Sequence, residues 1–165
     1  MQETRFNPVR PTGVPPEPCE DQLALLQSDD PELARNKRLV FDFWRIVYEG
    51  GHLDRAAEFM ADEYIQHNPN LPSGRQTFVD FFKQVREPGE IADRIRQPLI
   101  AVVAEGDKVT LSFVRKVDNP TCEGEVYYMT WFDMFRIENG RIAEHWDSSP
   151  LWTEGKPPGA RYLPR

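Results

Sequence analysis

The residues with the clearest chemical potential are two histidines and one aspartate that lie far apart in the chain. His67 stands in YIQHNPNLPSGR, between a helical pattern and a loop rich in Asn and Pro, whereas His145 and Asp147 stand in AEHWD. Imidazole titrates near neutral pH, and a neighbouring carboxylate holds its tautomer or shares its proton. A His67–Asp147 dyad in a dry cavity is therefore a candidate for proton transfer, with His145 beside Asp133 as a structural pair.

The neighbours of Asp147 depend on a hairpin. Residues 125–137 and 141–149 have the pattern of two strands around Glu138-Asn139-Gly140, a strong hairpin signal. On a strand, His145 and Asp147 point to the same face. Aspartate at a strand end is also commonly exposed or caps a turn, and this structural interpretation stays open.

Two hairpin registers fit the pattern. A two-residue turn at Asn139-Gly140 places Phe132 opposite Asp147 and Met134 opposite His145. A three-residue loop shifts the pairing by one residue, to Trp131 and Asp133. Either register gives Asp147 an aromatic neighbour, and such surroundings suit a carboxylate that transfers protons.

Other motifs that carry chemistry are absent from the sequence. It contains no G-x-G-x-x-G, no G-x-x-x-x-G-K and no H-E-x-x-H, and three scattered histidines give weak support for zinc. Cys19 and Cys122 lack metal-ligand spacing, so we expect two free thiols. The residues themselves therefore predict no metal site.

Composition narrows the class of protein. A chain of 165 residues, 39% of them hydrophobic and including ten Phe and four Trp, fits one domain with an aromatic core. A net charge of −7 without a basic run argues against nucleic acid. The apolar runs are too short to span a bilayer, and the N-terminus lacks the apolar stretch of a secretory signal. We therefore expect a cytoplasmic protein with no membrane partner.

The periodicity of the chain changes near residue 90. Helical patterns fill residues 31–51, 53–64 and the segment after Ser73-Gly74, and alternating strand patterns fill 96–117, 125–137 and 141–149. The predicted class is α+β, with three helices on one face of a curved, mainly antiparallel sheet of four strands. Such a cone can hold a small apolar ligand in its mouth. We expect a Pro-rich extension over 1–30, the folded domain over 31–150 and a tail over 151–165.

Three segments together carry a family resemblance. YIQHNP, SGRQTFVDFF and FDMFRIENGRIAEHWD resemble the SnoaL-like polyketide cyclases of the nuclear transport factor 2-like superfamily, over about residues 31–150. The resemblance implies a cone-shaped α+β barrel, frequently a homodimer that packs sheet against sheet. It also implies catalysis without a metal or organic cofactor.

The resemblance assigns roles to residues as well. Asp147 is implied as the acid/base on an enolisable carbonyl compound, with His67 as its partner in the cavity and Tyr64 or Asn68 orienting the carbonyl oxygen. Aldol-type cyclisation of a small, largely apolar carbonyl substrate is the first expectation. The further residues expected around the substrate are Trp44, Phe82, Trp131 and His145, with Phe59 and Trp152 also affecting the size of the pocket.

Two other functions remain open. An isomerase or dehydratase would use the same acid/base pair, because the proton transfer is the same. A non-catalytic module would hold a small hydrophobic ligand, and its polar residues would only orient that ligand.

Overall fold

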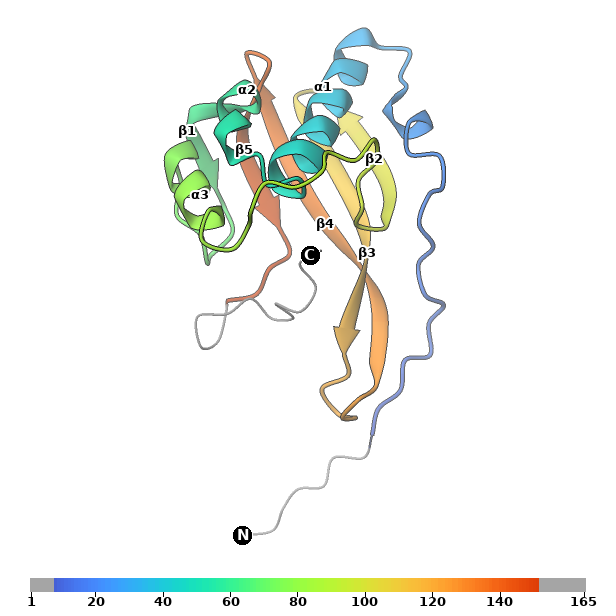
Figure 1. The fold of residues 1–165 in the computed structure, drawn as a ribbon. Coiled ribbons are helices and arrows are strands. Elements are labelled where there is room, and N and C mark those ends of the chain that lie inside the picture. Colours follow the sequence, from blue (N-terminus) through green and yellow to red (C-terminus); the bar gives the residue numbers. More distant parts are fainter. Residues whose placement is uncertain (1–7, 152–165) are drawn as a thin grey trace.

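A five-stranded sheet in the order β1-β5-β4-β3-β2 forms the frame of the computed structural model, which describes residues 8–151. All neighbouring strands are antiparallel except β1, which runs parallel to β5. The helices lie on one face of the curved sheet (Figure 1). The α+β prediction is confirmed, and the sheet stays open instead of closing into a barrel. The strands are β1 (Met60–Gln66), β2 (Leu99–Glu105), β3 (Lys108–Asp118), β4 (Val126–Glu138) and β5 (Arg141–Asp147).

The first long helix begins where its sequence predicts. Asp30 is its N-cap and accepts a hydrogen bond from the Glu32 amide at 2.7 Å, with Pro31 in the first turn. The helix continues into a wider π-helical turn that ends before Gly50. The helical elements are η1 (Ala24–Leu26), α1 (Pro31–Asp42), η2 (Phe43–Tyr48), η3 (Leu53–Arg55), α2 (Ala56–Phe59) and α3 (Arg75–Phe82).

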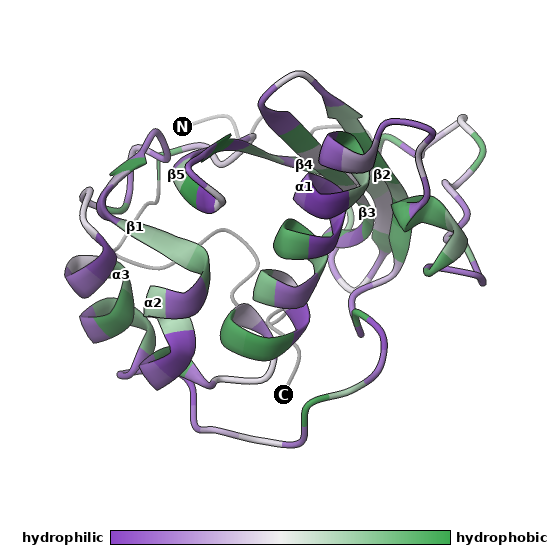
Figure 2. Cartoon of the chain, turned by 90° about the horizontal axis from the view of Figure 1, so that it is seen from above, coloured by the Kyte–Doolittle hydropathy of each residue, from purple (hydrophilic) through white to green (hydrophobic). Residues whose placement is uncertain are grey.

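Aromatic rings join the helices to the sheet. Trp44 on η2 stacks on Phe113 of β3, with ring centroids 4.7 Å apart, and Phe43 lies 6.0 Å from Phe135 of β4. All four side chains are buried. Viewed from above, hydrophobic and hydrophilic bands alternate along α1, as expected for a helix with one buried face (Figure 2). The core expected from the many Phe and Trp residues is therefore present.

The helix expected over 53–64 is wrong in its second half. Helix α2 has four residues, and β1 begins at Met60. In β1 the side chains of Met60 and Tyr64 are buried, whereas Asp62 and Glu63 are exposed. This spacing of four also fits a helix, so local sequence does not distinguish the two. Backbone pairing with β5 decides the matter, and the sheet therefore has five strands instead of four.

Both predicted registers of the last hairpin are also corrected. The turn has two residues, Asn139 and Gly140, with φ of 51° and 71°. Glu138 pairs with Arg141 and Ile137 with Ile142, but Arg136 pairs with Glu144. Residue 143 is therefore an extra residue in β5, a β-bulge. Beyond the bulge Asp147 lies opposite Asp133, instead of Phe132 or Trp131. His145 lies opposite Phe135, instead of Met134 or Asp133.

The described part of the N-terminal extension follows the edge of the sheet in an extended conformation (Figure 1). The Cys19 amide donates to the Leu99 carbonyl on β2 at 2.7 Å. Further along, the Asn119 side chain donates to the Val9 carbonyl at 2.9 Å, at the tip of the β3–β4 hairpin. Residues 1–7 and 152–165, which include Trp152 and nearly all of the expected C-terminal tail, lie outside the described residues.

Two simpler expectations can be compared with the structure. Cys19 and Cys122 are free thiols, as expected. Within residues 8–151, no helix combines the length and the apolar character needed to cross a bilayer.

Gly51 packs closely against the segment that follows α3. It has φ of +73°, and a Cβ added there would lie 2.4 Å from the Glu87 carbonyl oxygen. Gly106 also has a positive φ, +54°, but nothing lies within 4 Å of its added Cβ. Gly106→Ala should therefore cost about 1–2 kcal/mol of unfolding free energy for the backbone conformation alone. Gly51→Ala should cost roughly 1–3 kcal/mol more, because a backbone atom must also move.

Urea unfolding of the two variants measures this difference. If Gly51→Ala and Gly106→Ala lose the same unfolding free energy, the segment after α3 does not pack against Gly51 as described.

Candidate active site

Three acid–base groups gather where the end of β5 lies beside the middle of β4, on the face of the sheet that the helices cover. A carboxylate oxygen of Asp133, a ring nitrogen of His145 and a carboxylate oxygen of Asp147 all lie within 4.8 Å of one another. Asp133 and His145 are buried, and Asp147 is half-buried. The bulge in β5 produces this meeting, because it brings Asp147 opposite Asp133. We call these three residues the acid–base cluster.

Gln66 of β1 fixes the tautomer of His145. Its Oε1 accepts a hydrogen bond from the Asn68 backbone amide at 3.1 Å, and a backbone amide can only donate. The same Oε1 lies 2.9 Å from His145 Nδ1, so this nitrogen must carry a hydrogen. His145 Nε2 therefore faces Asp133 Oδ1, 3.0 Å away, and the two atoms share one proton. The expected His145–Asp133 pair is confirmed as a contact.

Asp133 is almost completely buried. The residue is 4% exposed, and its Oδ2 has no hydrogen-bond partner among the described residues. Burial raises the pKa of Asp133; the hydrogen bond from His145 opposes this, and the charge of Asp147 adds to it. The shift therefore acts on the carboxyl group that lies 3.0 Å from His145 Nε2 and beside Asp147.

Asp147 is held from both sides by donors. Asn68 Nδ2 donates to Oδ2 at 2.6 Å, and the Ser149 amide donates to Oδ1 at 2.9 Å. Asn68 is itself buried, and its Oδ1 accepts from the backbone and the side chain of Asn70. Asn68 was predicted to contact substrate. The structure instead places it as the residue that positions the Asp147 carboxylate.

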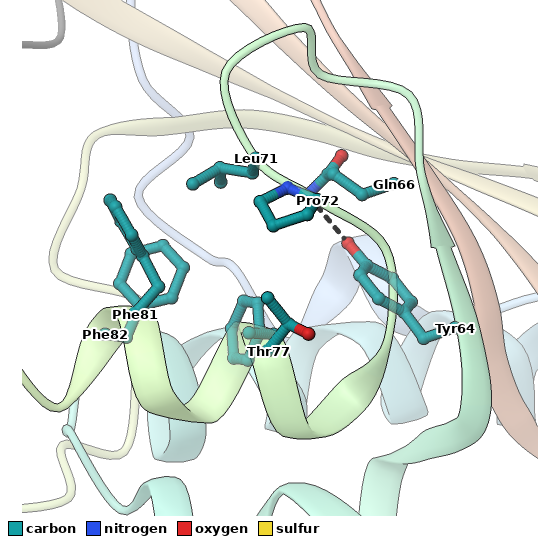
Figure 3. A pocket seen from close by; sticks show the side chains of 8 residues that line it. Tyr64, Gln66, Leu71, Pro72, Thr77, Phe81 and Phe82 are labelled. Atoms are coloured by element: carbon teal, nitrogen blue, oxygen red, sulfur yellow. Dashed lines mark hydrogen bonds between the residues drawn. The ribbon is translucent and has the colours of Figure 1, made fainter. Parts of the chain in front are cut away.

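Tyr64 connects the acid–base cluster to a pocket. Its hydroxyl accepts a hydrogen bond from Gln66 Nε2 at 3.0 Å (Figure 3). Burial raises the pKa of Tyr64 well above its ordinary value, and the charges of Asp147 and Asp133 raise it further. The phenol therefore keeps its proton, and within residues 8–151 no acceptor is hydrogen-bonded to it. This O–H group is available to a ligand.

The pocket lies between α3 and the loop after β1. It has an empty volume of about 200 Å³, part of it open to solvent. Tyr64 and Gln66 stand at one end, and Phe81 and Phe82 stand at the other (Figure 3). Its remaining wall is mostly apolar and comes from Leu71, Pro72, Thr77 and Phe78.

His67 does not join Asp147, so the expected dyad is corrected. Its Nε2 lies 2.8 Å from Glu144 Oε2, and its ring stacks on Trp146 with centroids 4.5 Å apart. Glu144 and Trp146 alternate with His145 and Asp147 along β5, so His67 lies on the opposite face of the sheet. The hydrogen bond from His67, followed by that from Arg136, lowers the pKa of Glu144.

The other predicted residues divide between the core and the concave face. Trp44 is buried against Phe113, and Phe82 lines the pocket. Trp131 is partly buried on β4, and the Arg115 guanidinium lies 3.7 Å from its ring centroid. Phe59, which was expected to affect the size of the pocket, is buried in the core beside Phe43.

Sequence reasoning missed the role of Gln66. The signal that could have found it is the spacing of two between Tyr64, Gln66 and Asn68, which gives one face of a strand. Because these residues were assigned to the end of a helix, that periodicity was not applied to them.

The acid–base cluster also has the residue types of a metal site. Both nitrogens of His145 already have protein partners, Gln66 and Asp133. A cation would need His145 Nε2 to give up its contact with Asp133. The hydrogen bonds described above account for this nitrogen without an ion.

An open, curved sheet with helices on one face and an acid–base cluster at the end of that face is an architecture of the nuclear transport factor 2-like class. The model of the SnoaL-like domain family matches residues 40–145. The chain therefore belongs to the SnoaL-like domain family. No curated protein sequence matches it.

Solved structures share the fold at low identity. A candidate SnoaL-like polyketide cyclase from Jannaschia sp. CCS1 has a TM-score of 0.51 and 16% identity, covering 74% of this chain and 91% of its own. A candidate polyketide cyclase from Acidithiobacillus ferrooxidans has a TM-score of 0.50 and 17% identity, with coverage of 73% and 89%. An LEH-like epoxide hydrolase from M. tuberculosis has a TM-score of 0.51 and 16% identity, with coverage of 71% and 84%. At these identities the likeness concerns the fold alone.

Gln66→Leu tests the hydrogen-bond network of the acid–base cluster. The variant keeps the apolar bulk but leaves His145 Nδ1–H and the Asn68 amide without their acceptor. We expect a loss of roughly 1–3 kcal/mol of unfolding free energy for each donor left unpaired in a buried site. Gln76→Leu is the matched control, because Gln76 lies exposed on α3 and bonds only to Asp80 among the described residues.

Urea unfolding of both variants gives the comparison. The control should change stability by no more than about 0.5 kcal/mol. A Gln66→Leu variant as stable as Gln76→Leu would mean that the carboxamide does not hold the imidazole.

Proposed function

We propose that this protein is a cofactor-independent acid–base enzyme that acts on a small, largely apolar carbonyl compound, with aldol-type cyclisation as its reaction. The observation that carries the proposal is the meeting of Asp147 with the hydrogen-bonded Asp133–His145 pair, near the protonated Tyr64 hydroxyl. Membership of the SnoaL-like domain family supports a cyclase or isomerase type of reaction.

In the proposed first step, the Asp147 carboxylate takes a proton from the carbon next to the substrate carbonyl. The C–H electron pair moves to form the enolate, and Tyr64 donates a hydrogen bond to the enolate oxygen. A phenol with a raised pKa donates without losing its proton, which suits stabilisation of an oxyanion. Tyr64 thus keeps the contact with the carbonyl oxygen that the sequence prediction gave to Tyr64 or Asn68, without help from His67.

In the second step, the enolate carbon attacks another carbonyl of the same molecule, and a carbon–carbon bond closes the ring. The new alkoxide takes a proton from the carboxylic acid of Asp147, which restores the carboxylate. Hydrogen bonds from Asn68 and the Ser149 amide hold the Asp147 carboxylate in place for both steps.

The pocket next to Tyr64 is narrow, because its empty volume of about 200 Å³ includes space that is open to solvent. Neighbouring side chains must move apart to admit a substrate. The aromatic and aliphatic lining of the pocket supports an apolar body, while Tyr64 and Gln66 offer the polar contacts at one end.

Asp147→Asn tests the proposal. Asparagine keeps the size of the side chain but cannot accept the substrate proton, so turnover of enolisable diketones should fall by roughly 10²–10⁴-fold, the usual contribution of a general base. The melting temperature should fall only in part, because asparagine keeps one acceptor oxygen but leaves the Asn68 side-chain amide or the Ser149 amide without its acceptor.

Glu63→Gln is the control, because it removes an exposed carboxylate from β1 and should leave turnover unchanged. The products of β-diketones, allylic ketones and hydroxy-ketones distinguish cyclase from isomerase and dehydratase. A folded Asp147→Asn variant with wild-type turnover would remove Asp147 as the acid/base.

A ligand-binding module is the second candidate, and the apolar lining of the pocket favours it. This function predicts that hydrophobic ketones bind without chemical change and that Asp147→Asn binds them as the wild type does. Recovering the ketones unaltered after long incubation, with saturable binding, would support the module over the enzyme.

The proposed homodimer would use the uncovered face of the sheet. Phe132 and Val103 on that face are 50% and 60% exposed, and Trp146 stacks there on His67. An apolar sheet face of this kind supports pairing with a second copy. Sedimentation equilibrium of the wild type and Phe132→Lys should show a dimer that the charge disrupts, and a monomeric wild type would refute it.

A further inference from the structure

Arg86 differs from the other arginines near the core. Arg45, Arg55, Arg75 and Arg136 each form an ion pair with an Asp or Glu. Among the described residues, no carboxylate lies within ion-pair distance of Arg86. Its Nε and Nη2 are buried, and neither has a hydrogen-bond partner in the described part of the chain.

The arrangement of these two atoms matters. Nε–H and one N–H of Nη2 point in the same direction from the planar guanidinium. This edge matches the two oxygens of a carboxylate, which it can bind through two parallel hydrogen bonds. Leaving buried donors of a charged group unpaired is costly, so such an edge is unusual in a folded protein.

Aromatic rings hold the guanidinium in place. Its central carbon lies 4.4 Å from the ring centroid of Tyr48 and 5.8 Å from that of Phe82. The Tyr48 ring in turn lies 5.4 Å from Phe82 and 4.4 Å from Trp44. These contacts fix the plane of the guanidinium while leaving its hydrogen-bonding edge to another group.

The position of Arg86 relates it to the pocket. Phe82 and Phe81 form the end of the pocket opposite Tyr64 (Figure 3). Arg86 lies one turn beyond Phe82, since its amide donates to the Phe82 carbonyl at 2.9 Å. Arg86 is not among the residues that line the pocket, so a ligand whose carbonyl meets Tyr64 reaches Arg86 only past Phe81 and Phe82.

We propose that Arg86 binds a carboxylate of the substrate, so that the substrate class is a carbonyl compound that also carries a carboxylate at its far end. The choice of a carbonyl compound rests on the proposed function, whereas the carboxylate site does not. Because the guanidinium edge is covered in this structure, the neighbouring side chains must shift when the carboxylate enters.

The charges near Arg86 agree with a carboxylate at this position. Tyr48 beside Arg86 has a raised pKa, chiefly because it is buried; the positive charges of Arg86 and Arg115 oppose the shift, and Asp133 adds to it. Arg86 has the largest effect of any charge on Tyr48, although the charge of Asp133 also acts there. An anionic group is therefore attracted to the guanidinium itself.

Calorimetric titration with benzoate tests the site, with benzamide as the neutral probe of the same shape. Benzoate should bind the full-length wild type at least about tenfold more tightly than benzamide, because it forms two charge-assisted hydrogen bonds. Arg86→Met should lose this preference. Arg86→Lys should retain part of it, since the charge remains but the paired donors do not. Arg94→Met, which removes an exposed arginine of the following loop, should bind benzoate as the wild type does.

The melting temperature without ligand separates binding from a structural role. Arg86→Met should melt at or above the wild-type temperature, because it removes a buried edge without partners. Equal binding of benzoate by the wild type and Arg86→Met, or no preference over benzamide, would overturn the proposal. If Arg86→Met does not fold, a wild-type affinity in Arg86→Lys would overturn it instead.

The Asp147→Asn variant keeps this proposal separate from the proposed function. It should bind benzoate at least as well as the wild type, because Arg86 is intact. If the protein binds benzoate but turns over no carbonyl compound, the proposal of a carboxylate site stands and the proposed enzymatic function is wrong.

Discussion

The β-bulge at Ala143 is the constraint on which the acid–base cluster depends. Before the bulge, Ile142 faces the core; after it, His145 and Asp147 face the same side. In a regular strand, residues 142 and 145 would point to opposite faces. The extra residue therefore allows one strand to supply both an apolar residue to the core and two titratable residues to the site.

The parallel strand β1 supplies further contacts to the acid–base cluster. Gln66 pairs with His145 in the sheet, and its carboxamide reaches the imidazole, the Tyr64 hydroxyl and the Asn68 amide. One side chain thus links the His145 imidazole, the Tyr64 hydroxyl and the loop that positions Asp147. The geometry of the site follows from strand pairing more than from any single charged contact, since the backbone sets the spacing of these groups.

The sequence was sufficient for the fold class but not for the site. Asp30-Pro31, Asn139-Gly140 and the alternation in residues 96–147 carry strong local signals, and the structure confirms the helix start, the turn and the antiparallel strands. His145, Asp133 and Asp147 were identified as residues of interest. Their mutual arrangement was not predictable, because a bulge shifts the register without a marked change in sequence pattern.

The errors at His67 and β1 have a common physical origin. Short segments such as 60–66 satisfy both helical and strand periodicity, and only pairing with β5, more than 70 residues later, decides between them. Once β1 is a strand, alternation sends His67 to the outer face and Asn68 to the inner face. Asn68 therefore makes the contact with Asp147 that was expected of His67.

Most of the pocket wall comes from a different part of the chain than the acid–base cluster, and Tyr64 and Gln66 of β1 join the two. Phe78, Phe81 and Thr77 of α3 shape the wall, whereas the cluster is held by strands β1, β4 and β5. Mutations on the inner face of α3 can therefore alter the shape of the pocket, while the residues of the acid–base cluster keep their positions. Under the proposed function, this arrangement would let a lineage change substrates by small steps without first losing its chemistry.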